Sequence, residues 1–249
     1  MQLKVLGSSS KGNCYLLDNG KECLVIECGI PFKEVEKAVN FDIKRIKGAI
    51  VSHEHGDHAK HVEKFIDARI PVYMSTGTLH EVMKKFKNQY HFPLMMEAMV
   101  KTKIGGFTIM PFDTQHDCAE PFGFLIHHPE CGTVLFATDT YYLQYTFQGL
   151  NNIMIECNYR LDILDANVEQ GKLHPALRSR TIKSHCSFDT CCEILQANDL
   201  TKVNNIVLIH LSDGNANPID FQRDIKELTG KTVNVARPGM VLDFNKSPF

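Results

Sequence analysis

The chain has 249 residues, of which 43% are hydrophobic and 22% are charged, and its formal net charge is −2. These values are typical of a single globular domain over residues 1–249, and they exclude a disordered chain, a collagen and a coiled coil. They also exclude a globally basic nucleic-acid binder, so any contact with nucleic acid must be local. With no apolar run near the ~20 residues of a membrane span and no signal-peptide pattern, we expect a cytoplasmic protein without a membrane partner.

Short β-rich runs alternate with helical runs, which is typical of an α/β domain. The expected strands cover residues 3–6, 14–17, 24–27, 48–52, 72–74, 107–112, 123–127, 134–137, 153–156, 206–209 and 233–235. The expected helices cover residues 32–39, 59–65, 77–85, 188–197 and 218–228. Because the alternation occurs in both halves of the chain, we expect two sheets packed face to face with helices outside. The basic segment 175–183 is predicted to be a loop, either a solvated face or a phosphate-binding flap.

The segment SHEHGDH at 52–58 is the strongest chemical signal in the sequence. It follows an apolar β-branched run, so it lies at the end of a buried strand. His53 and His55 are two residues apart in extended chain and point the same way, so they can bind one ion together. A glycine then allows a sharp turn, after which Asp57 and His58 can reach a second ion. Three imidazoles and a carboxylate suit a borderline ion such as zinc.

Three further ligand types each follow an apolar strand: His116, Asp139 and His210. Each is a weak signal alone, but together with the 52–58 segment they complete two metal sites. One ion would bind His53, His55 and His116. The other would bind Asp57, His58 and His210, and Asp139 would bridge the two ions. The predicted cofactors are two divalent ions, with zinc as the default and manganese or iron as alternatives. The incomplete coordination leaves room for a bridging hydroxide.

The HxHxDH motif at 53–58, followed by a distant His, Asp and His, resembles the metallo-β-lactamase superfamily over nearly the whole chain. The resemblance is closer to its YycJ-type branch, which is related to ribonuclease Z. The shared motifs are LGSSSKGN at 6–13, HDCAEP at 116–121, ATDT at 137–140, ECN at 156–158 and HLS at 210–212. The resemblance implies a four-layer αβ/βα sandwich with a two-metal site at one edge, and DNA exonuclease activity.

Two departures from the family pattern bear on the site. The first motif of the superfamily usually carries Asp, whereas this chain has Glu27, a longer carboxylate expected to support the metal ligands from behind. Tyr141 stands where the branch usually has Gly, so we expect a narrower rim beside Asp139. Neither departure removes a predicted metal ligand, and both affect substrate choice more than catalysis.

The expected mechanism uses a metal-bridging hydroxide as the nucleophile, which Asp57 orients and deprotonates. The leaving oxygen needs a proton, and the resemblance to ribonuclease Z implies that His185 supplies it. The alternative for His185 is a structural contact between a loop and the metal shell.

The favoured substrate is a phosphodiester, because a two-metal clamp and His185 are accompanied by basic residues. Arg side chains bind phosphate with two parallel hydrogen bonds. The predicted substrate-binding residues are Arg178, Arg180, Lys183, Ser8 and Asn13. For the two N-terminal residues, a simple glycine-rich turn is the alternative.

Nucleic acid is the expected partner, with DNA exonuclease activity as the leading hypothesis. One alternative is a phosphodiesterase of small cyclic or linear nucleotides, which the near-neutral charge and Tyr141 favour. Another is hydrolysis of a thioester, lactam or lactone, which the fold permits but which leaves His185 and the basic segment without a role. A metal-stabilised binding module is the non-catalytic alternative. We also consider a homodimer, since dimers are common among soluble proteins.

Overall fold

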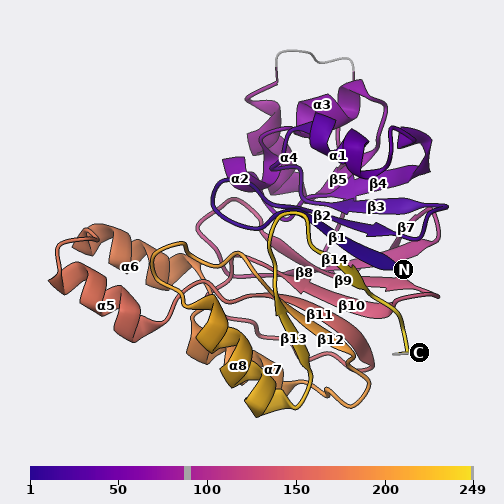
Figure 1. The fold of residues 1–249 in the computed structure, drawn as a ribbon. Coiled ribbons are helices and arrows are strands. Elements are labelled where there is room, and N and C mark those ends of the chain that lie inside the picture. The colour runs from indigo at the N-terminus through magenta and orange to yellow at the C-terminus, as the bar shows by residue number, and fades with distance from the viewer. Residues whose placement is uncertain (87–90, 248–249) are drawn as a thin grey trace.

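A computed structural model describes residues 1–86 and 91–247 of the chain, and in these residues the strands form two seven-stranded sheets. Figure 1 shows the two sheets stacked face to face, with helices on their outer sides. The first sheet has the order β14 (Val241–Asp243), β1 (Gln2–Gly7), β2 (Cys14–Asp18), β3 (Cys23–Ile26), β4 (Ile46–Ile50), β5 (Val72–Met74) and β6 (Leu94–Met95). The second has the order β13 (Thr232–Val235), β12 (Asn205–Ile209), β11 (Leu150–Glu156), β10 (Gly132–Ala137), β9 (Phe122–His128), β8 (Phe107–Asp113) and β7 (Thr102–Ile104).

The burial pattern of each strand follows from its place in these sheets. All seven residues of β11 are buried, because β11 pairs in parallel with both β10 and β12 and is covered on both faces. In contrast, β1 alternates between buried and more exposed residues. It pairs with β14, whose register places Gln2 opposite Asp243, so the two ends of the described chain lie close together (Figure 1).

Helices cover the outer face of each sheet. The first half of the chain contributes α1 (Phe32–Ala38), the 3-10 helix η1 (Ile43–Arg45), α2 (Gly56–Ala59), α3 (Val62–Asp67) and α4 (Thr76–Met83). The second half contributes α5 (Leu161–Glu169), α6 (Pro175–Ser184), α7 (Phe188–Ala197) and α8 (Pro218–Thr229). Figure 1 shows α7 and α8 against the second sheet, whereas α5 and α6 extend beyond it. In the described residues, no helix is long and apolar enough to cross a membrane.

Three apolar clusters separate the four layers. The central cluster lies between the sheets and includes Tyr15 and Ile26 from the first sheet and Phe124 and Phe136 from the second. A second cluster joins the outer face of the second sheet to α7 and α8, and a third joins the first sheet to α1 and α3. This arrangement confirms the predicted four-layer αβ/βα sandwich.

The structure corrects several predicted elements. Residues 175–183 form helix α6 rather than a loop, because Pro175 occupies the first helical turn and the His174 side chain accepts a hydrogen bond from the backbone N–H of Ala176. The helix predicted at 59–65 is divided into α2 and α3. The sequence did not predict α5 or the short strands β6, β7 and β14, whose two or three residues carry too little periodicity to be recognised.

Candidate metal centre

The predicted ligands converge at one edge of the sandwich because strands of both sheets end there. His53 and His55 follow β4, and Asp57 and His58 lie in α2, directly after that loop. In the second sheet, β10, β11 and β12 are parallel, so the residues that follow them share one edge. His210 follows β12 and Asp139 follows β10 in this way, and His116 follows β8, which runs in the same direction as β10.

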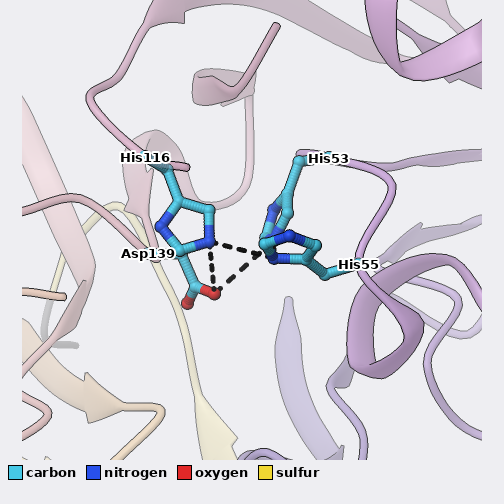
Figure 2. A group of neighbouring side chains, drawn as sticks. All are labelled: His53, His55, His116 and Asp139. Carbon is cyan, nitrogen blue, oxygen red and sulfur yellow. Dashed lines mark hydrogen bonds and ion pairs between the residues drawn. The ribbon is translucent and has the colours of Figure 1, made fainter. Parts of the chain in front are cut away.

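The first ligand group consists of His53, His55, His116 and Asp139, and their ligand atoms all lie within 4.8 Å of one another. Figure 2 shows the four side chains pointing toward a common point. His55 Nδ1 lies 3.1 Å from His53 Nε2 and 3.0 Å from His116 Nε2. Asp139 Oδ2 lies 3.5 Å from His53 Nε2 and 3.6 Å from His116 Nε2. Several nitrogens that face one another without a carbonyl or hydroxyl partner are typical of a cation site.

The second ligand group consists of Asp57, His58, Asp139 and His210. His58 Nε2 lies 3.3 Å from Asp57 Oδ2 and 3.2 Å from Asp139 Oδ2. His210 Nε2 lies 3.1 Å from Asp57 Oδ2, and its Nδ1 lies 3.2 Å from Asp139 Oδ1. Asp139 therefore belongs to both groups, which is the position of a ligand shared between two ions.

Glu156 is a site residue to which the sequence analysis assigned no role. It is fully buried at the end of β11, and its Oε1 lies 2.7 Å from His185 Nδ1 and 3.0 Å from His210 Nδ1. Its Oε2 accepts hydrogen bonds from the backbone N–H groups of Thr140 and Cys186. The signal that could have found it is the one that identified Asp139: a carboxylate that ends an otherwise apolar strand.

Glu27 lies behind the second ligand group. Its side chain is fully buried, and its Oε2 lies 3.5 Å from His58 Nδ1. It also accepts a hydrogen bond from the backbone N–H of Ser52, at the start of the histidine segment. A carboxylate in this position fixes the orientation of the imidazole that faces the cluster.

Three residues of the cluster adopt left-handed backbone conformations. The φ angles are 68° for Glu27, 46° for Asp139 and 53° for His210. Non-glycine residues occupy this region rarely, at a cost of about 1–3 kcal/mol each, and such residues gather at functional sites. Each of the three follows a strand. Asp139 and His210 have their side chains in the cluster, and Glu27 contacts His58 from behind.

Burial and charge interactions act together on the ionisation of the cluster. Burial alone would raise the pKa of Asp139, but His210 and His58 hold it well below the usual range. Burial also opposes protonation of His210, yet Asp139, Asp57 and Glu156 raise its pKa to about 10. Burial lowers the pKa of His53, which favours the neutral imidazole that binds metal. The carboxylates thus attract positive charge into the cluster, and divalent ions would displace the protons that the histidines hold.

A cavity of about 460 Å³ opens onto the cluster and is lined by ligands of both groups and by His185. Helix α6 forms one wall through Leu177, Arg180 and Thr181, which lie on one face at helical spacing. Of the three basic residues predicted to bind substrate, only Arg180 lines this cavity, and its Nε lies 3.3 Å from Asp117 Oδ2. Arg178 instead pairs with Asp165, at 2.5 Å, and Lys183 is exposed outside the cavity.

Ser8 and Asn13 lie beneath the cluster rather than in the cavity that opens onto it. Ser8 Oγ accepts hydrogen bonds from the backbone N–H of His210, at 3.0 Å, and from the hydroxyl of Tyr15. Asn13 is only 1% exposed, and its Nδ2 lies 3.3 Å from His58 Nε2 and donates to the carbonyl oxygen of Ser9. Both side chains thus support ligands of the second group.

Comparison with known proteins identifies the family. Residues 9–140, more than half of the chain, match the metallo-beta-lactamase superfamily. Exodeoxyribonuclease YycJ of Bacillus anthracis is 27% identical over 251 residues, which cover 94% of this chain and 88% of that protein. Zn²⁺-bound PqqB of Methylobacterium extorquens has a similar structure, with a TM-score of 0.73 and 12% identity over 98% of this chain and 100% of PqqB. The short form of human tRNase Z has a TM-score of 0.64 and 14% identity, over 98% and 99% of the two chains.

The chain therefore belongs to the metallo-beta-lactamase superfamily and is a hydrolase of that family. This confirms the resemblance on which the sequence analysis relied. The fold implies that divalent metal is bound, and the two His/Asp groups are the residues suited to hold it.

Proposed function

We propose that the protein is a two-metal phosphodiesterase that degrades DNA as an exonuclease. The observation that carries the proposal is the position of Asp139, which lies in both ligand groups at the floor of one cavity. Two-metal sites of this kind hold both the attacking and the leaving oxygen of a phosphoryl centre. The exodeoxyribonuclease name of the Bacillus anthracis relative supports DNA as the substrate.

The donor set fits two divalent ions. His53, His55 and His116 would hold one ion, Asp57, His58 and His210 would hold the other, and Asp139 would be shared. Buried imidazoles combined with few carboxylates favour zinc over calcium or magnesium, with manganese or iron as alternatives. When bound, the ions polarise the phosphodiester and allow water to attack at neutral pH.

The residues of the chain then have separate tasks. Asp57 has a lowered pKa, because hydrogen bonds from His210 and His58 outweigh the effect of burial, so its carboxylate is ionised and can orient the attacking water. We also assign to it the acceptance of the water's proton, because it lies in the second ligand group. His185 lines the cavity, and Glu156 raises its pKa despite burial, so it holds a proton to give to the leaving oxygen. Glu156 is a positioning residue, because it holds the other ring nitrogen of His185. Arg180 is placed to bind a phosphate of the substrate.

The test is to incubate metal-quantified protein with end-labelled duplex DNA, single-stranded DNA and RNA in parallel. We expect progressive shortening of DNA from one end, and loss of this activity in His55→Ala. DNA degradation that is the same in His55→Ala would come from a contaminant and would refute the proposal.

A second candidate is a phosphodiesterase of small cyclic or linear nucleotides. The cavity of about 460 Å³ is within the ~300–1,000 Å³ typical of small-molecule sites, so it is large enough for a mononucleotide. Cyclic mononucleotides are therefore included in the same assay. Their hydrolysis without degradation of DNA would favour this candidate over the exonuclease.

A further inference from the structure

A second cavity, of about 770 Å³, lies directly beside the one that opens onto the metal ligands. Leu211 and Ser212 line both cavities, so the second cavity adjoins the one at the cluster. Its walls come from residues 6–12, from the segment after His210, from the start of α8, and from residues 234–240 at and after the end of β13. None of the tasks assigned above uses this space.

The lining combines an aliphatic surface with two unpaired polar side chains. Leu6, Ile30 and Met240 are among the apolar residues, and no aromatic side chain contributes in the described part of the chain. The side chains of Asn234 and Arg237 form no hydrogen bond or ion pair with any residue that the structure describes.

The other long polar side chains of the lining already have partners. Lys11 pairs with Asp213, at 3.0 Å, and Gln222 donates to the carbonyl oxygen of Val233, at 2.7 Å. An apolar cavity with a few unpaired polar groups is the usual form of a ligand site. The two groups available to a ligand are therefore one amide and one guanidinium.

These two groups suit a nucleotide. An amide can both donate to and accept from the edge of a nucleobase, and a guanidinium binds phosphate through two parallel hydrogen bonds. The aliphatic walls can cover the faces of the base and sugar. Without aromatic side chains, contact by stacking is weak, so the base must be held mainly through its edge.

We infer that this second cavity holds the nucleotide next to the scissile phosphate, with Asn234 at the base and Arg237 at the following phosphate. The inference rests on the proposed function, because it assumes a nucleic-acid strand in the catalytic cavity. It goes further by assigning a subsite for the flanking nucleotide and by predicting that the protein senses the identity of that base.

The first test compares Arg237→Ala with Arg223→Ala, which removes another exposed arginine, on α8 and outside both cavities. For a single-stranded oligonucleotide, we expect Arg237→Ala to raise KM about tenfold and to reduce the salt dependence of binding by about 0.7 in the log–log slope. Arg237→Lys keeps the charge and should lie in between. With bis(4-nitrophenyl) phosphate, which has no flanking nucleotide, the increase in KM should be much smaller. Arg223→Ala should behave as the unmodified protein.

The second test uses an oligonucleotide with an abasic residue next to the scissile bond, placed on either side in turn. For the abasic residue on one of the two sides, kcat/KM of the unmodified protein should be about tenfold lower than for the intact oligonucleotide. For Asn234→Ala this difference should be far smaller, because the variant lacks the amide that contacts the base. Unchanged oligonucleotide kinetics in both Arg237→Ala and Asn234→Ala would overturn the inference while the exonuclease proposal stands.

Binding separates failure of the subsite from failure of the proposed activity. If metal-loaded protein cleaves no oligonucleotide, the exonuclease proposal fails, and the subsite is tested with a fluorescein-labelled phosphorothioate oligonucleotide at equilibrium. Weaker binding to Arg237→Ala than to Arg223→Ala would support the subsite. Equal binding to the two variants, or no binding to the unmodified protein, would overturn it.

Discussion

Glu156 Oε1 lies 2.7 Å from Nδ1 of His185, so a buried carboxylate holds the ring that borders the catalytic cavity. The same oxygen lies 3.0 Å from Nδ1 of His210, a ligand of the second group. One carboxylate therefore orients both an expected proton donor and an expected metal ligand. Its replacement should disturb proton transfer and metal binding together, whereas replacement of His185 should disturb only the first.

His185→Ala should reduce the rate of DNA hydrolysis by about 10²–10⁴-fold, the usual contribution of a positioned proton donor. The loss should be much smaller with bis(4-nitrophenyl) phosphate, because 4-nitrophenolate leaves without needing a proton. The measurement is kcat for both substrates at equal metal content. Equal losses for the two substrates would argue that His185 has a structural role instead.

His55→Ala should lower the number of ions bound per chain from two toward one, because it removes a ligand of the first group only. Metal content after dialysis, measured by mass spectrometry, tests this. His80→Ala is the matched control, since His80 is an exposed histidine outside all the ligand groups. An unchanged metal content in His55→Ala would show that the first group does not hold an ion.

Arg180→Ala should raise KM for DNA about tenfold, the equivalent of ~1.4 kcal/mol of lost phosphate binding. Arg178→Ala should have little effect on KM, because Arg178 is paired with Asp165 and does not line the cavity. Steady-state kinetics of the two variants provide the comparison. A larger effect of Arg178→Ala would mean that α6 presents a different face to the substrate.

Asp18→Asn should lower the free energy of unfolding by about 1–3 kcal/mol near neutral pH, because it removes hydrogen bonds between charged groups. Asp18 is 3% exposed and lies 2.8 Å from Lys4 Nζ and 2.6 Å from Arg45 Nη1. Burial would raise the pKa of its carboxyl, but bonds from Lys4, Gly20 and Arg45 lower it below the usual value.

The pH dependence of this effect has a definite sign. A lowered pKa in the folded state stabilises the protein above the unfolded value of about 3.9. That stabilisation is lost as pH falls through the folded value, so the difference between Asp18→Asn and the unmodified protein should shrink in acid. Urea unfolding across this range measures it, with the exposed Asp67→Asn as control. A difference that is constant with pH would contradict the ionic origin of the effect.

Local patterns predicted most of the fold and the positions of the ligand types. The strands that carry ligands have long apolar runs, so their ends were recognisable, and the left-handed turns after them aim the side chains inward. The roles of the basic residues could not be predicted in the same way. Arg178 and Arg180 are two residues apart in a region expected to be a loop. Because the region is the helix α6, the two side chains point to different sides, one toward Asp165 and the other toward the cavity.

The sequence patterns could not predict contacts between segments that are far apart in the chain. Glu156 acquires its partners from the segments after β10 and α6, so its role depends on how these segments pack together. Ser8 and Asn13 have side chains that can donate to a substrate, but in the fold Ser8 bonds to His210 and Tyr15, and Asn13 is buried beside His58. The sequence shows which side chains can form hydrogen bonds, and only the fold shows which neighbours they bond to.

The two ligand groups draw on both sheets, so metal held by them would cross-link the two halves of the chain. In each group, residues after β4 meet residues after strands of the second sheet. A chain in which only one sheet has formed therefore offers an incomplete set of ligands and binds metal weakly. Tight metal binding would therefore come late in folding, and bound metal would hold the sheets together, since binding free energy is gained only by the assembled sandwich.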